Sequence, residues 1–139
     1  MKTRYSTLVD LKKNIVQKSE QTLQKANADL NSAATAFQIS YDSLHSIESP
    51  QEGKISTYKA SRTLVNVARE LINHNKEWIE FANKQVQSAK EKLKLDMIEY
   101  EKYKYLDLQE VKELVKKIKQ EELKELDEVA LMTFSRKKD

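Results

Sequence analysis

The stretch IESPQEGKIS, residues 47–56, contains the only proline and the only glycine of the 139-residue chain, Pro50 and Gly53. Proline ends a helix because it lacks an N–H group and its ring clashes with the preceding turn. Glycine readily adopts the left-handed conformation that other residues disfavour. We therefore expect a single reversal of the chain here, with a long helix on each side of it.

The composition supports the same expectation. Charged residues make up 34% of the chain and hydrophobic residues 39%. A compact domain draws on Gly and Pro for its many turns, and this chain has one of each. Its abundance of Lys, Glu, Leu and Ala is typical of long helices. The sequence predicts one all-α domain over residues 1–139.

The spacing of the apolar residues predicts how the two helices pair. Apolar or small residues recur in 3-4-4 steps from Leu8 to Leu44, and in strict 3-4 steps from Tyr58 to Leu93. The strict repeat is the heptad of a coiled coil, and an eleven-residue repeat is close to a straight helix. We predict an antiparallel coiled-coil hairpin with unequal arms. Helix one covers about residues 3–48, the turn 49–54 and helix two about 55–134.

Folding the chain about residue 51 or 52 places Ala26 opposite Trp78 and Ala33 near Leu71, so that small residues meet large ones. The apolar stripe from Tyr58 to Leu93 is widened by Leu64, Leu71 and Trp78. Asn75 interrupts that stripe, and a single buried Asn typically fixes register and partner at some cost in stability. Helix one then reaches only to about residue 100 of helix two.

The remainder of helix two carries an apolar stripe without a predicted partner inside the chain. Its members are Leu108, Val111, Leu114, Val115, Ile118, Leu126, Val129 and Ala130. An exposed apolar face usually marks an interaction site. Three interpretations remain open: the segment pairs with a second copy of the chain to give a homodimer, it docks into a different protein, or it is a frayed tail.

No motif in the sequence carries catalysis. The chain has no cysteine, so it forms no disulfide or thiolate metal site. Neither His45 nor His74 has a second ligand at metal spacing. One glycine cannot build a phosphate-binding loop, and two paired helices offer no concave substrate pocket. We expect no enzyme activity, no cofactor and no metal.

Charge and hydropathy exclude two further classes. Lysines and acidic residues alternate along the helices, giving a net charge of only +3. Nucleic-acid binding would require a denser basic patch with aromatic residues. No segment is apolar over the length of a signal peptide or a membrane span. We expect a cytoplasmic, soluble protein that does not insert directly into the membrane.

The chain opens with RYSTLVDLKK, a basic and aromatic start followed by leucines, and it ends with KELDEVALMTFSRKK, an acidic pair, an apolar residue and alanine before a basic finish. Both ends resemble those of the flagellar export protein FliJ family. The unequal two-helix layout agrees over essentially the whole chain. The resemblance implies a component of the flagellar type III export apparatus, at the cytoplasmic face of the inner membrane.

The same resemblance implies partners and sites. In that family the coiled coil inserts its terminal end into a hexameric ring of the export ATPase FliI, promotes ring assembly, contacts the export gate protein FlhA and handles export chaperones. The ATPase-binding residues would be Arg4, Tyr5, Leu8, Leu114, Val115, Ile118, Leu126 and Val129. The gate patch falls at Thr63, Val67, Glu70 and His74, of which Val67 and His74 match.

Other functions share this architecture. An export chaperone or holdase would also be a helical hairpin, although a prefoldin needs β-hairpins that this sequence does not predict. A stalk subunit of another rotary ATPase, or of a virulence secretion system, would show the same pattern of two long paired helices.

Overall fold

The computed structural model describes residues 2–48 and 50–138. They form two helices, α1 (Ser6–His45) and α2 (Ile55–Lys138), and no strand occurs among these residues. The all-α prediction is confirmed. The contacts divide the chain into two compact units: unit 1 combines Met1–Val16 with Asp96–Asp139, and unit 2 is Gln17–Leu95. Each unit is described by itself.

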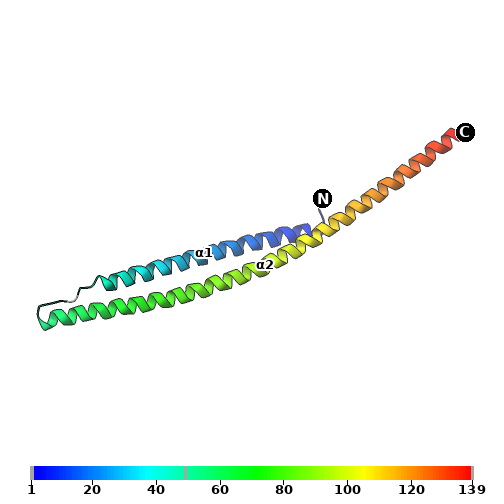
Figure 1. Ribbon diagram of the computed structural model, residues 1–139. Coiled ribbons are helices and arrows are strands. Elements are labelled where there is room, and N and C mark those ends of the chain that lie inside the picture. The colour runs from blue at the N-terminus through cyan, green and yellow to red at the C-terminus, as the bar shows by residue number, and fades with distance from the viewer. Residues whose placement is uncertain (1, 49, 139) are drawn as a thin grey trace. The chain divides into compact units, whose positions relative to one another are not determined.

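Unit 2 is an antiparallel helical hairpin, in which α1 and α2 lie side by side (Figure 1). Its core is narrow and built largely from small side chains. Ala26 packs with Val86 and Ala89, and Leu23 and Leu30 cover this cluster. Small residues let the helix axes approach closely, so a two-helix structure can still exclude water from its centre.

The buried positions of α2 in unit 2 follow the predicted heptad. They are Ser61, Val65, Ala68, Ile72, Asn75, Ile79, Ala82, Val86, Ala89 and Leu93, all buried or half-buried. Leu64, Leu71 and Trp78, predicted to widen this stripe, are exposed instead.

The predicted 3-4-4 repeat of the first helix is wrong. In unit 2 the buried or half-buried stripe of α1 is Ser19, Leu23, Ala26, Leu30, Ala33, Phe37, Ser40 and Leu44, a strict 3-4 repeat. Thr22 and Tyr41, members of the predicted stripe, are exposed. The physical reason is that two helices that stay in contact over several heptads must present the same repeat to each other.

Asn75 sets the register of unit 2. Its side-chain amide donates to the backbone carbonyl of Ala36 and to Oγ of Ser40, each at 3.1 Å. Ser40 in turn donates to the carbonyl of Phe37 at 2.8 Å. These bonds pair Asn75 with residues far from those that a fold about residue 51 or 52 would bring to it. The predicted contact of Ala26 with Trp78 is therefore wrong, because Ala26 packs against Val86 and Ala89.

The linker between the helices explains why the observed pairing of α1 with α2 is displaced from the predicted one. Helix α1 ends at His45, and half-buried Ile47 and Pro50 line a shallow hollow together with Ala60 and Leu64 of α2. The linker thus packs along the first turns of α2. Gly53, with φ of +147°, adopts the backbone conformation that favours glycine close to the start of α2.

In unit 1 the start of α1 pairs with α2 beyond the predicted limit of residue 100. Arg4 forms an ion pair with Glu110 at 3.2 Å, and the hydroxyl group of Thr3 donates to Asp107. Figure 1 shows the start of α1 beside this part of α2. Thr3 also caps α1, because its Oγ1 accepts from the N–H group of Tyr5 at 3.1 Å.

Candidate functional site

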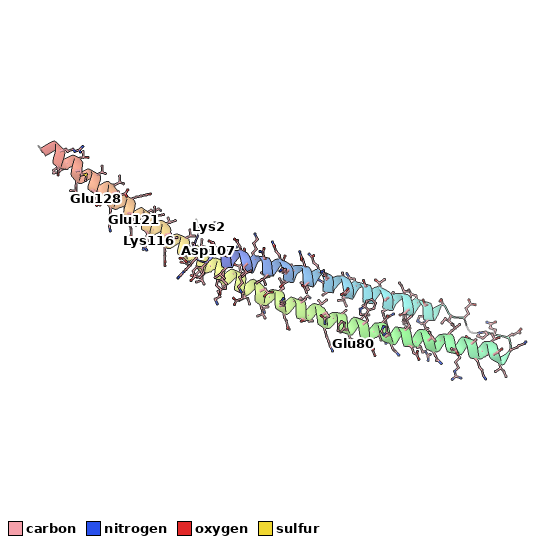
Figure 2. All side chains as sticks on the ribbon, turned by 180° about the vertical axis from the view of Figure 1, so that it is seen from behind. Lys2, Glu80, Asp107, Lys116, Glu121 and Glu128 are labelled. Carbon is pink, nitrogen blue, oxygen red and sulfur yellow. The ribbon has the colours of Figure 1, made fainter. Side chains whose placement is uncertain are left out.

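The C-terminal part of α2 is exposed throughout. Every residue from Val115 to Arg136, which we call the overhang, is exposed. Leu126 and Val129 are 64% and 58% exposed, and Val115 and Ile118 less so. Figure 2 shows charged side chains such as Lys116, Glu121 and Glu128 along the same segment. A helix with this much accessible apolar surface resembles an unoccupied interface.

The overhang begins later than the sequence indicated. Val111 and Leu114, predicted to lack a partner, are half-buried in unit 1. Leu108 is exposed. The stretch in which every residue is exposed therefore starts at Val115, and Leu114 marks its boundary with the paired part of unit 1.

The structure places the predicted N-terminal site residues against α2. The Arg4 guanidinium lies 4.9 Å from the centre of the Tyr5 ring, and that ring lies 6.5 Å from the Tyr103 ring. Tyr5, and then Glu110, raise the pKa of Arg4, which keeps its positive charge at any physiological pH. Leu8 is exposed. Arg4 and Tyr5 thus form one cluster with Tyr103 and Glu110, within unit 1.

A second exposed apolar surface lies on α2 in unit 2. Its residues, which we call the ridge, repeat in 3-4 steps outside the buried stripe: Leu64, Val67, Leu71, His74, Trp78 and Phe81, all exposed. His74, Trp78 and Phe81 line a shallow open hollow with Glu77. Val67 and His74, predicted from the family resemblance, thus belong to a longer surface.

Sequence reasoning missed Phe81 and assigned Leu64, Leu71 and Trp78 to the helix pairing. The signal for the ridge was present as a second 3-4 repeat, offset by one residue from the buried one. Thr63 and Glu70 each precede a ridge residue by one position and therefore border the ridge.

No group of three or more His, Cys, Asp or Glu among the described residues could hold a metal ion. Within the ranges 2–48 and 50–138, no helix combines the length and apolar character needed to cross a membrane. Three surfaces are the functional candidates: the overhang, the cluster around Arg4 and Tyr5, and the ridge.

Comparison with known proteins gives one match. A family model described as Flagellar FliJ protein matches residues 1–139. No curated protein matches the chain, and neither does any solved structure.

Proposed function

Because the chain belongs to the FliJ family, whose model matches residues 1–139, we propose that it docks the flagellar export ATPase and the export gate through two separate surfaces of α2. Membership of the family makes the chain a component of flagellar protein export, and we propose that it has no catalytic activity of its own. The proposal concerns which surfaces serve which partners.

The overhang is the proposed docking element for the export ATPase FliI. The observation that carries this proposal is the exposure of every residue from Val115 to Arg136. Apolar side chains such as Ile118, Leu126 and Val129 gain free energy when a partner removes them from water. A hexameric ring can enclose a single helix from all sides, which suits a segment with no pairing helix of its own.

The apolar face of the overhang carries a polar interruption. Glu122 lies four residues after Ile118 and four before Leu126, so the three side chains lie on the same side of the helix. A partner that covers this face must offer a positive charge or a hydrogen-bond donor opposite Glu122, because an unpaired buried carboxylate is strongly unfavourable. This requirement would fix the position of the partner along the helix.

The cluster around Arg4 and Tyr5 extends the proposed ATPase surface. Exposed Leu8 and half-buried Leu114 belong to the same unit as this cluster and the overhang. Aromatic and arginine side chains are enriched among residues that dominate binding energy. We assign Arg4, Tyr5, Leu8 and Leu114 to the ATPase interface together with the overhang.

The ridge is the proposed docking surface for the gate protein FlhA. Val67 is 57% exposed, and Trp78 and Phe81 add aromatic area on the same side of α2. Glu70 and Glu77 border the ridge, so a partner with basic side chains along its edge would be favoured. The ridge lies in unit 2 and the overhang in unit 1, so the two proposed partners would contact different residues of α2. Export chaperones are the third proposed class of partner. Binding to the gate would bring the chain to the cytoplasmic face of the inner membrane.

The test combines purified FliI with increasing amounts of the chain. We expect the turnover of FliI and its hexameric fraction both to rise, measured by phosphate release and by sedimentation velocity. The chain alone should release no phosphate from ATP. If FliI keeps its turnover and its oligomeric state across the whole titration, the ATPase half of the proposal is wrong. If the chain elutes as a dimer that dissociates on Leu126→Asp, the overhang serves self-association.

A further inference from the structure

The first residues of α1 are held against α2 by polar contacts. The hydroxyl groups of Thr3 and Ser6 both donate to Oδ1 of Asp107. Arg4 pairs with Glu110, although the Arg4 side chain remains 74% exposed. Lys12 lies 4.0 Å from Glu99. Exposed ion pairs contribute little to stability and are weakened further by salt.

Apolar burial in this region is slight. Among the described residues of unit 1, Val16 is the only buried one, at 9% exposure, and Tyr5, Val9, Ile15 and Val111 are half-buried. Leu8 and Leu11 are exposed although they lie in the paired segment of α1. In unit 2, by contrast, Ala26, Val86 and Ala89 form a buried cluster. Because apolar burial is the main favourable term in folding, the segment before Val16 is the part of the helix pairing that opens most easily.

Asp107 couples the start of α1 to α2. Thr3 accepts a hydrogen bond from the N–H group of Tyr5, and Ser6 Oγ accepts one from the N–H group of Thr3 at 2.9 Å. The two hydroxyl groups that cap the helix are therefore the same two that bond to Asp107. Loss of the bond to Asp107 removes the anchor to α2 and loosens the cap in one step.

From these contacts we propose that residues 2–15 form a strap that opens from α2 as a unit while unit 2 stays folded. Opening exposes Tyr103, against which the Tyr5 ring packs, and the half-buried Leu106 and Val111 that lie beside the contact residues Asp107 and Glu110. The accessible apolar face of α2 then extends from the overhang back to about residue 103. The strap acts as an internal cover for this part of α2. The inference goes beyond the proposed function and does not rest on it, because opening is a property of the free chain.

Hydrogen exchange of the full chain tests the strap. The variant is Asp107→Ala, which removes the acceptor of both hydroxyl groups. The control is Asp127→Ala, which makes the same chemical change at an exposed position of the same helix. We expect amide protection over residues 9–15 to fall at least tenfold in Asp107→Ala and to stay unchanged in Asp127→Ala. Protection over residues 26–44 should be the same in all three proteins.

A second measurement uses the unmodified chain, so that a misfolded variant cannot decide the outcome. Raising the salt concentration from about 50 mM to about 500 mM shortens the range of electrostatic interactions. Protection over residues 9–15 should fall severalfold, and protection over residues 26–44 should not. Equal protection of the two segments at both salt concentrations would overturn the proposal, as would equal exchange in Asp107→Ala and Asp127→Ala.

Discussion

Replacing both Leu126 and Val129 by aspartate tests the overhang most directly. Both side chains lie on the exposed part of α2 and are 64% and 58% exposed in the free chain. The substitutions put two charges where the proposed interface is apolar. They leave the paired residues of both units untouched, so we expect the thermal midpoint of the chain to change little.

The structure sets the size of the effect. Full burial of a leucine or valine side chain contributes about 1.5–3 kcal/mol. Roughly three fifths of each side chain is still available for burial, which leaves about 1–2 kcal/mol for each residue. The pair therefore contributes about 2–4 kcal/mol. Since every 1.4 kcal/mol or so is a factor of ten, affinity for FliI should fall by at least tenfold and by as much as several hundredfold.

The chain offers a closely matched control. Leu95 is 64% exposed and Val67 is 57% exposed, nearly the same values as for Leu126 and Val129, but both lie in unit 2. The double variant Leu95→Asp with Val67→Asp therefore introduces the same charges at equally exposed positions. Binding of each protein to FliI is measured by titration calorimetry or by interferometry at one salt concentration.

Two outcomes would refute the reasoning. If the overhang variant binds FliI and raises its turnover as the unmodified chain does, the overhang is not the docking element. If the control variant loses as much affinity as the overhang variant, the loss reflects added negative charge and not a buried apolar contact. Arg4, Tyr5 and Leu8, at the start of the chain's first helix, would then be the next residues to test.

Three further predictions concern unit 2. The double variant Val67→Glu with His74→Ala should weaken binding to FlhA by at least tenfold in a binding titration while helicity and FliI affinity stay the same; unchanged FlhA affinity would place the gate site elsewhere. Asn75→Ala should lower the free energy of unfolding by about 1–2 kcal/mol in urea titrations, because two hydrogen bonds are lost. The control Asn83→Ala, at an exposed position, should not lower it. Gly53→Ala should lower the free energy of unfolding by about 1 kcal/mol in the same assay, because φ of +147° is unfavourable for alanine and the added Cβ would meet only Thr57, at 3.6 Å. An unchanged midpoint would mean that the linker readily adopts another conformation.

The sequence predicted the helices and the repeat of α2 because both depend on local pattern. The predicted repeat of α1 included Ser19, which is almost fully buried. It failed at Ser40, which is also almost fully buried and is satisfied by Asn75 and Phe37. The prediction took exposed Tyr41 in place of Ser40, and exposed Thr22 in place of half-buried Leu23.

The register could not be predicted for a different reason. It depends on how far the linker travels along α2 before the chain enters that helix. Half-buried Ile47 and Pro50 show that the linker packs along α2 and does not turn back at once. A sequence pattern marks a break between helices but does not give the path of the chain across it. For the candidate site, the apolar end of α2 was visible in the sequence, whereas the ridge was hidden because its repeat lies beside the buried one.

The strict heptad on both sides of unit 2 limits how this protein can change in length during evolution. An insertion of seven residues in one arm of the hairpin would displace every later contact, including that of Asn75 with Ser40. It would be tolerated only with a matching seven-residue insertion at the opposed position of the other arm. The overhang carries no such constraint, because no opposing helix fixes its length. Among homologous chains, length differences within the hairpin should therefore occur as paired heptads, and unpaired differences should fall in the linker or at the C-terminal end.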